Sequence, residues 1–386
     1  MGIKDLPFAR TEYSARLKKV RHAMAARDIT CLFVTDPSNM AWLTGYDGWS
    51  FYVHQGVVVT HDTGPLWWGR MQDKAGALRT VWMDDDRVAG YAEHFIQTTD
   101  CHPMEDLAQY LGGRVGVEME NYYYSAKAHA VLAQAGVDMV DATALVNWCR
   151  AVKSDAEIWF MRKAARISEA VVDGMAERIA PGVPKNEVVA DAFRDAIRGV
   201  GDDWGDYPAI VPLVPSGADA AAPHLTWDGR PFVEGEATTI EIAGCYRRYH
   251  APLCRSVFLG TPPDEMKRAE GAILEGLEAG INAARAGNRT CDVAEALNGA
   301  MRKIGIERTP RCGYPIGLSY PPDWGERTMS FRATDQTVLE PNMTFHFMPG
   351  LWMDGWGLAI TESIRITDSG AAECLADRPR GIIVKT

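Results

Sequence analysis

The sequence predicts an α+β protein with an N-terminal α/β domain and a C-terminal domain in which a helix pair followed by strands occurs twice. Before residue 150, short β-branched apolar runs alternate with helical patterns, which is typical of helices packed around one sheet. Beyond that point, two long helix pairs each precede strand-rich segments. The 386 residues also exceed the usual size of one domain. We therefore expect domains at residues 1–152 and 153–386.

The N-terminal elements follow from apolar periodicity. A helical pattern at Glu12–Arg27 leads into an apolar strand at Cys31–Thr35, and the Pro and Asn residues that follow predict a turn. Gly56–Thr60 predicts another strand because it is short and β-branched. The later elements predicted for this domain are a helix at Met71–Met83, a strand at Arg114–Met119, a helix at Ser125–Ala135 closed by Gly136, and a strand at Val137–Val140.

The C-terminal elements begin with two long helical patterns, Ser154–Ile179 and Lys185–Val200, separated by the breakers of Pro181–Pro184. Strand-rich segments and a second helix pair follow. In order, they are strands in Ala209–Val214, Ala237–Ala243 and Tyr249–Leu259, helices at Pro263–Ala286 and Cys291–Ile304, and strands in Thr344–Trp352 and Leu358–Thr367. This order of elements predicts an internal duplication, although no residue repeat is strong enough to prove it.

The composition excludes several classes of function. There are 40 Lys and Arg against 51 Asp and Glu, so the net charge is −11. The sequence has no cluster of basic residues that would bind the phosphate backbone of a nucleic acid. No apolar stretch is long enough to span a membrane, and the N-terminus lacks a signal-peptide core, so we expect a cytoplasmic protein. The eight cysteines are scattered, without the spacing of a zinc site or a disulfide framework.

Three motifs from residue 150 onward resemble those of the creatinase, aminopeptidase P and prolidase superfamily. They are Arg150–Ala165, Ser216–His224, and Leu339–Met343 followed by Met348-Pro-Gly350. The resemblance implies that the N-terminal domain is creatinase-like and that the C-terminal domain has the pita-bread fold. It also implies a homodimer in which the N-terminal segment of one subunit reaches the active site of its partner.

The metal site of that superfamily is largely missing. Its metal-dependent members hold two divalent ions with two Asp, one His and two Glu. These five positions correspond here to Glu241, Pro252, Tyr314, Met348, and either Thr361 or Glu362. Proline and methionine cannot replace hard carboxylate ligands, so we expect no metal and no other cofactor.

A narrower resemblance points to a substrate. Asp36–Tyr52, Glu241–His250 and Phe345–Trp352 are similar to superfamily members that open the cyclic amidine of ectoine and 5-hydroxyectoine. This implies metal-independent hydrolysis to N-acetyl-L-2,4-diaminobutyrate in compatible-solute catabolism. Three alternatives stay open: a creatinase-like hydrolase of another amidino or guanidino compound, a prolidase-type Xaa-Pro metallopeptidase, and a non-catalytic binding homologue.

Three residues are the candidate catalytic groups. His224 matches the substrate-facing histidine of the superfamily, and an imidazole titrates near neutrality. Glu241 lies in an apolar strand, where it faces the substrate cation, attacks it as a nucleophile, or instead pairs with an arginine such as Arg255. Glu362 shares a strand face with four aliphatic residues, and this pattern indicates a carboxylate facing a ligand.

The candidate substrate-binding residues are mostly aromatic. Trp49, Phe51 and Tyr52 belong to an aromatic cluster whose ring faces attract delocalised cations, although core packing also explains such clusters. Tyr314 replaces a metal histidine and either donates a hydrogen bond to the substrate or packs. His346 lies in one of the segments that carry the narrower resemblance.

Overall fold

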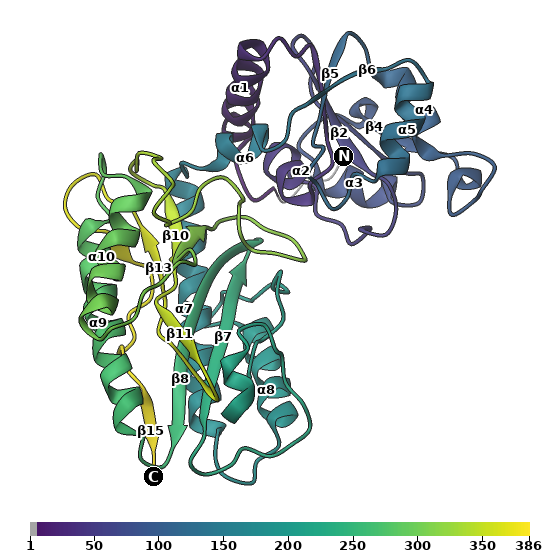
Figure 1. Ribbon diagram of the computed structural model, residues 1–386. Helices are drawn as coiled ribbons and strands as arrows, with labels where there is room; N and C mark the ends of the chain where they lie inside the picture. Colours follow the sequence, from purple (N-terminus) through teal and green to yellow (C-terminus); the bar gives the residue numbers. More distant parts are fainter. Residues whose placement is uncertain (1–5) are drawn as a thin grey trace. The chain divides into compact units, whose positions relative to one another are not determined.

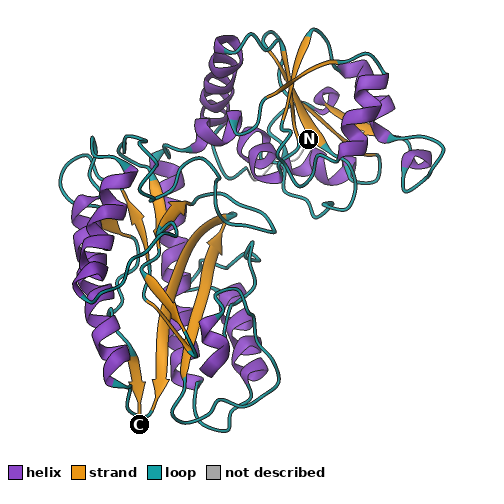
Figure 2. Ribbon diagram, viewed as in Figure 1, coloured by secondary structure: helices purple, strands orange, loops and turns teal. Residues whose placement is uncertain are grey.

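The computed structural model describes residues 6–386, which form two compact units that divide between Arg150 and Ala151. The N-terminal unit is built on one six-stranded sheet, and each unit combines helices with strands (Figure 2). In the C-terminal unit, the two longest strands have α9 and α10 on one side and α8 on the other (Figure 1). The predicted α+β class is therefore confirmed.

The N-terminal sheet has the strand order β4-β3-β2-β1-β5-β6. Strand β1 pairs antiparallel with β2 and parallel with β5. The strands are β1 (Cys31–Val34), β2 (Gly56–Thr60), β3 (Leu66–Arg70), β4 (Val88–Tyr91), β5 (Arg114–Val117) and β6 (Asp138–Asp141). The helices are α1 (Arg10–Ala26), α2 (Pro37–Thr44), α3 (Lys74–Thr80), α4 (Pro103–Leu107), α5 (Ala126–Gln134) and α6 (Leu145–Arg150), with 3₁₀ turns η1 (Asp85–Arg87), η2 (Glu93–Phe95) and η3 (Ala108–Tyr110).

Helix α2 replaces the turn that we predicted after the first strand. The carboxylate of Asp36 caps it by accepting hydrogen bonds from the backbone N–H groups of Ser38 and Asn39, at 2.8 and 3.4 Å. Pro37 occupies the first helical position, where a missing N–H costs nothing. The Pro and Asn residues that indicated a turn are thus part of a helix start.

The C-terminal unit contains two helix pairs and several small sheets. Its helices are α7 (Asp155–Arg178), α8 (Lys185–Arg198), α9 (Asp264–Ala283) and α10 (Thr290–Lys303), with the 3₁₀ turn η4 (Gly217–Ala221). Its strands are β7 (Ala237–Tyr246), β8 (Tyr249–Leu259), β9 (Gly313–Pro315), β10 (Thr344–Phe347), β11 (Gly350–Met353), β12 (Trp356–Ala359), β13 (Glu362–Arg365), β14 (Glu373–Cys374) and β15 (Ile383–Lys385). The sheets have the orders β15-β8-β7, β14-β13-β10-β9 and β11-β12.

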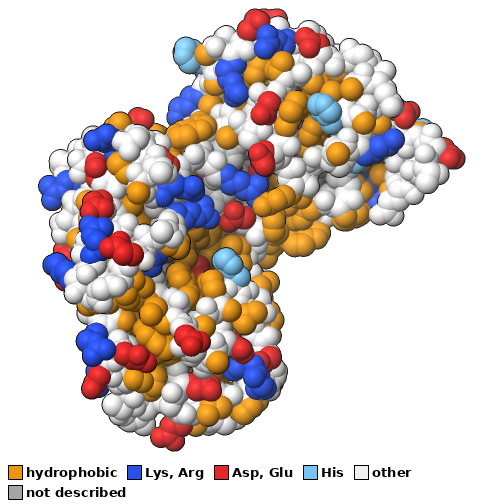
Figure 3. Space-filling model, viewed as in Figure 1, with side chains coloured by type: hydrophobic (Ala, Val, Ile, Leu, Met, Phe, Trp, Pro, Cys, Tyr) orange, Lys and Arg blue, Asp and Glu red, His pale blue; other side chains and the backbone are white. Residues whose placement is uncertain are grey.

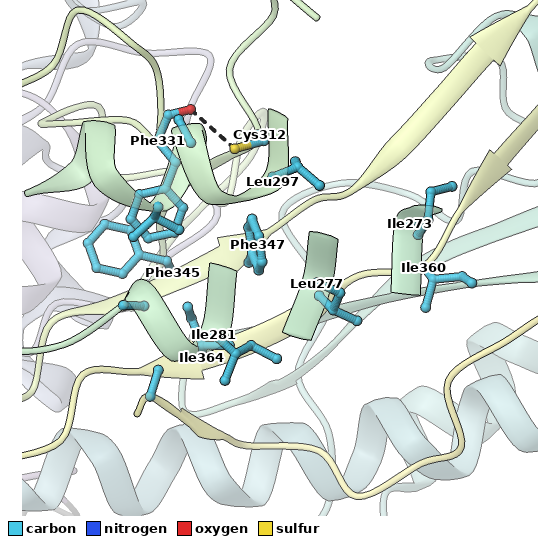
Figure 4. Close-up of a cluster of buried hydrophobic side chains, with 14 of the residues drawn as sticks. Ile273, Leu277, Ile281, Leu297, Cys312, Phe331, Phe345, Phe347, Ile360 and Ile364 are labelled. Atoms are coloured by element: carbon cyan, nitrogen blue, oxygen red, sulfur yellow. Dashed lines mark hydrogen bonds between the residues drawn. The ribbon is translucent and has the colours of Figure 1, made fainter. Parts of the chain in front are cut away.

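Each helix pair covers its own hydrophobic core. Apolar residues of α7 and α8 pack against Ile240, Leu253 and Val257 of the β7–β8 hairpin. Those of α9 and α10 pack against Phe345, Phe347 and other residues of the later strands (Figure 4). This arrangement agrees with the duplication of helix pair and strands that the element order predicts.

Two predicted strand segments differ from the structure. Residues 209–214 form no regular strand and instead make an isolated bridge between Leu213 and Glu241. The segment predicted at Leu358–Thr367 divides at Ile360 and Thr361, so that β12 pairs with β11 whereas β13 pairs with β10. This division decides which way Thr361 and Glu362 face.

None of the helices within residues 6–386 has the length and apolar character needed to cross a bilayer. Acidic and basic side chains are interspersed on the face shown in Figure 3.

Candidate active site

A buried polar cluster lies where strands β7, β9, β10 and the β12–β13 junction come together. It contains Glu241 on β7, Tyr314 on β9, His346 on β10, and Thr361 just before β13. Tyr314 and His346 face each other as directly paired residues of β9 and β10. The sequence predicted three of these residues, whereas Thr361 was noted only as a lost metal ligand.

The imidazole of His346 is held from both sides. Its Nδ1 lies 3.0 Å from the Tyr314 hydroxyl, and its Nε2 lies 2.7 Å from Thr361 Oγ1. The indole N–H of Trp324 donates to the Tyr314 hydroxyl at 2.7 Å, and the backbone N–H of Cys254 donates to Thr361 Oγ1 at 2.8 Å. Burial lowers the pKa of His346 to about 3, so its imidazole is neutral near pH 7.

Glu241 supplies the acidic group of the cluster. Its side chain is only 11% exposed, and its Oε1 lies 4.0 Å from His346 Nδ1. Among residues 6–386, no Lys or Arg forms an ion pair with it, so the alternative pairing with Arg255 is wrong. Burial raises its pKa to about 7. A cation placed beside this carboxylate would favour its ionised form.

Register explains why Arg255 is out of reach of Glu241. In the β7–β8 hairpin, Glu241 lies opposite Cys254, and Arg255 lies opposite Ile240. Successive residues of a strand point to opposite faces of the sheet. Glu241 and Arg255 therefore point to different faces.

Glu362 requires a correction, because the structure does not bring it to this cluster. It pairs with Phe347 in the β10–β13 register, whereas His346 pairs with Ser363, so Glu362 lies on the face opposite His346. Its Oε1 accepts hydrogen bonds from Arg255 Nη2 at 2.8 Å and from Arg380 Nε at 3.2 Å. The aliphatic face that indicated a ligand site is the face toward the core, and Oε1 of the carboxylate is engaged in a buried ion pair, whereas Oε2 is buried without a hydrogen bond from the described chain.

His224 lies in a turn directly after η4, and its side chain is exposed. It makes no hydrogen bond or ion pair with any residue of the described chain. The 3₁₀ turn η4 packs closely against Gly357 of β12. A side chain at position 357 would prevent this packing, because its Cβ would lie 1.9 Å from the Ala220 carbonyl oxygen. The bond of 2.9 Å between the Ser216 and Thr238 hydroxyls ties the start of this loop to β7.

The aromatic candidates belong to the N-terminal unit. Trp49 and Tyr52 are 60% and 63% exposed. Trp49 contacts Phe51 edge-to-face, with ring centroids 4.8 Å apart, and Phe51 also lies beside Tyr123. Trp49, Phe51 and Tyr123 therefore form a small ring cluster that is partly exposed at the surface of this unit.

A pocket of about 530 Å³ with three arginines in its lining is linked to the cluster by Arg311, which lines the pocket and also contacts Tyr314. The guanidinium of Arg311 lies 4.7 Å from the centroid of the Tyr314 ring. The pocket is lined by Arg311, Arg327, Thr328, Met329, Ser330, Arg332, Thr334, Asp335 and Gln336. Sequence reasoning missed these arginines, and also Trp324, because a loop brings them to the site without any periodic pattern.

The metal-ligand positions of the cluster do not form a metal centre. Within residues 6–386, no three His, Cys, Asp or Glu side chains are placed to hold a metal ion together. The hydroxyls of Tyr314 and Thr361 are used in hydrogen bonds to His346.

Comparison with known proteins identifies relatives along the whole chain. Residues 160–368 match the model of metallopeptidase family M24, and residues 16–152 match the creatinase/prolidase N-terminal domain. The chain is 56% identical to the ectoine hydrolase of Halomonas elongata, over 99% of both chains. It is 40% identical to an uncharacterised hydrolase/peptidase of Sinorhizobium fredii, over 99% of this chain and 100% of that protein.

Solved structures share the fold at lower identity. A dipeptidase PepE from Mycobacterium ulcerans superimposes with a TM-score of 0.80 at 22% identity, covering 98% of this chain and 99% of that one. The prolidase of Pyrococcus horikoshii gives a TM-score of 0.81 at 19% identity, over 96% and 100%. With a family model over more than half of its length and a creatinase-type domain before it, the chain belongs to metallopeptidase family M24, within the creatinase/prolidase superfamily of hydrolases.

Proposed function

We propose that this chain hydrolyses the cyclic amidine of ectoine and 5-hydroxyectoine in the cytoplasm, without a metal ion, to N-acetyl-L-2,4-diaminobutyrate. One observation carries the proposal: the carboxylate of Glu241 is buried beside the Tyr314–His346 pair and has no Lys or Arg partner in the described chain. Such a carboxylate needs a cation, and a protonated amidine is one. The 56% identity to an ectoine hydrolase supports the same substrate.

The chemistry fits a site without a Lewis acid. The carbon of an amidinium is already electron-poor, so it needs no metal to polarise it. Glu241 pairs with the cation and either attacks the carbon itself or activates a water molecule that attacks it. The oxygen of water ends on the amidine carbon as the new amide carbonyl. The carbon–nitrogen bond breaks, and the departing nitrogen receives a proton, for which His224 is the proposed donor.

The ring carboxylate of the substrate needs a positive partner, and the pocket with three arginines in its lining supplies one. Arg311, Arg327 and Arg332 line this pocket, and Arg311 contacts the Tyr314 ring. Guanidinium groups bind carboxylates through paired hydrogen bonds. We therefore assign the carboxylate to the pocket side of Tyr314 and the amidine to the Glu241 side.

The residues present do not fit the two metal ions that the family name implies. Pro252 has no side-chain donor, and Met348 offers only a soft thioether where hard ions need oxygen. With Tyr314 and Thr361 at two further positions, only Glu241 remains as a hard ligand. A metallopeptidase reaction is for this reason the weaker candidate.

Ring opening of ectoine is the direct test. We expect the purified enzyme to convert ectoine to the Nα-acetyl product in an NMR assay, at a rate that a strong chelator does not change. Creatine and Xaa-Pro dipeptides serve as controls and should not react. Turnover of those controls with inert ectoine would refute the substrate, and chelator-sensitive turnover with stoichiometric metal would refute metal independence.

His224→Ala is expected to lower kcat by about 10²–10⁴-fold, which is the usual contribution of a general acid. Because the side chain is exposed and unbonded within the described chain, the thermal midpoint Tm should not change. Steady-state kinetics together with a melting curve measure both effects. Near-normal kcat in the variant would remove His224 from the proposed mechanism.

A homodimer with shared sites predicts complementation between inactive variants. If Trp49 acts in the active site of the partner subunit, Trp49→Ala and Glu241→Gln subunits should recover activity when mixed, since one site of each heterodimer is intact. The Trp49→Ala variant mixed with itself is the control. Absence of recovery after verified subunit exchange would show that each chain builds its site alone.

A further inference from the structure

A chain of hydrogen bonds runs through the cluster from a backbone amide to the Tyr314 hydroxyl. The N–H of Cys254 donates to Thr361 Oγ1 at 2.8 Å, and Thr361 Oγ1 lies 2.7 Å from His346 Nε2. His346 Nδ1 lies 3.0 Å from the Tyr314 hydroxyl, which also accepts from Trp324 Nε1 at 2.7 Å. Both ends are groups that can only donate, the amide and the indole, so the direction of every bond between them can be worked out.

The direction is set first at Thr361. Its hydroxyl is 1% exposed and already accepts from the Cys254 N–H. Its own proton then needs an acceptor, and in the described chain His346 Nε2 is the one within hydrogen-bond distance. If Nε2 carried a proton instead, the Thr361 hydroxyl would receive two donors while its own proton stayed unbonded in the core. Leaving a buried donor without an acceptor is unfavourable, so Nε2 is the acceptor.

The tautomer of His346 follows from this step. A neutral imidazole carries one proton, and with Nε2 accepting, that proton is on Nδ1. The Nδ1–H group then donates to the Tyr314 hydroxyl, since the Glu241 carboxylate is farther away, at 4.0 Å. The phenol oxygen accepts from both His346 and Trp324, so it has no lone pair left for a third donor. The proton of the Tyr314 hydroxyl therefore points away from His346 and Trp324 and is available to another acceptor.

We propose that Thr361 is a positioning residue that holds His346 in its Nδ1–H tautomer and so makes the Tyr314 hydroxyl a donor, and not an acceptor, toward the substrate. This inference rests on the proposed function for the identity of the substrate. In a planar amidinium, both nitrogens are N–H donors, and their lone pairs are delocalised. The Tyr314 O–H therefore finds no good hydrogen-bond acceptor on the amidinium nitrogens of the bound substrate before the reaction begins.

The interaction becomes favourable when the amidinium carbon is attacked. The carbon then becomes tetrahedral, and a ring nitrogen regains a localised lone pair that accepts the Tyr314 O–H. An interaction that appears only on the way to the transition state raises kcat and leaves KM nearly unchanged. Tyr314 stays protonated throughout, because burial and the nearby Glu241 raise its pKa well above the usual value.

The test uses Thr361→Val, which removes the hydroxyl at nearly constant volume, and Thr361→Ser, which restores it. Nitrogen NMR of the substrate-free enzyme with labelled histidine should show His346 protonated at Nδ1 in the wild type and in Thr361→Ser, and a changed proton distribution in Thr361→Val. His346→Gln identifies the resonance among the nine histidines. We expect kcat to fall about 10–100-fold in Thr361→Val, the usual effect of losing a partner that orients a functional histidine, and to recover in Thr361→Ser.

The two measurements separate the possible failures. A wild-type imidazole protonated at Nε2 would overturn the inference, as would normal kcat in a folded Thr361→Val enzyme. Because the NMR measurement needs no substrate, an Nδ1–H tautomer in an enzyme that leaves ectoine unchanged would support the hydrogen-bond chain and overturn only the proposed substrate.

Discussion

Glu241→Gln is expected to lower kcat by about 10³–10⁴-fold while the chain stays folded, because glutamine keeps the shape of the side chain and loses its charge. The variant can neither balance the amidinium nor act as nucleophile or base. Glu234→Gln, an exposed position just before the same hairpin, is the matched control and should leave kcat unchanged. Turnover within tenfold of the wild type would exclude Glu241 from the reaction.

Glu241→Gln is expected to lower kcat but to raise the free energy of unfolding, and the size of this gain depends on pH. The folded-state pKa of Glu241, about 7, lies above the ordinary value of 4.5 for a glutamate side chain. Its contribution to stability is therefore fully present below pH 4.5 and is lost as the pH rises through 7. Glutamine does not titrate. Relative to the wild type, Glu241→Gln should gain about 2–3 kcal/mol in free energy of unfolding between pH 5 and pH 8. Denaturant titrations at the two pH values measure this gain.

A variant that is less active and, at pH 8, more stable is the signature of a group kept for function at the expense of stability. A structural carboxylate would behave differently, since its removal would lower stability at every pH above its pKa. The pair of measurements at Glu241 thus separates these two roles without any assumption about the substrate.

The fold was predictable from sequence because most of it depends on local patterns. The spacing of Tyr13, Leu17, Val20 and Met24 gives α1 one buried face, and periodicity of this kind is visible without the structure. Helix α2 was missed because its Pro and Asn residues favour turns as strongly as helix starts, and the Asp36 cap decides between them.

The residues alone predicted the candidate site only where one residue conflicts with its surroundings, whereas Tyr314 and His346 were predicted from the family resemblance. Glu241 is a carboxylate in an apolar strand, and this conflict is visible in the sequence. Trp324 and Thr361 carry no such signal, because an indole and a hydroxyl are ordinary in a core once their hydrogen bonds are made. Their partners are supplied by other strands, and spacing along the chain does not reveal them.

Glu362 presents the same conflict as Glu241, yet the structure resolves it in another way. Its partner Arg255 lies on β8, more than 100 residues earlier in the chain, so the sequence gives no sign of the ion pair. A carboxylate on an aliphatic strand face is therefore compatible both with a ligand site and with a buried ion pair. Only the register of β7, β8, β10 and β13 distinguishes the two cases.

Glu362→Gln is accordingly expected to destabilise the folded state by about 3–5 kcal/mol, because it leaves the guanidinium of Arg255 buried without a counter-charge. Both partners are only 1% exposed. Turnover per folded molecule should not change. Glu373→Gln is the matched control on neighbouring β14, where the carboxylate pairs with Arg162 and Arg365 but is 31% exposed. Such an exposed pair contributes only about 0–1 kcal/mol.

A double replacement distinguishes the ion pair from a catalytic carboxylate. Arg255→Met combined with Glu362→Leu removes both buried charges, and it should recover most of the stability that Glu362→Gln loses, since apolar side chains can replace a buried pair at little or no cost. If Glu362 serves only the fold, the double variant also keeps its turnover of ectoine. If the double variant is stable but has lost its turnover, Glu362 has a role in catalysis. The reaction would then use a second carboxylate besides Glu241.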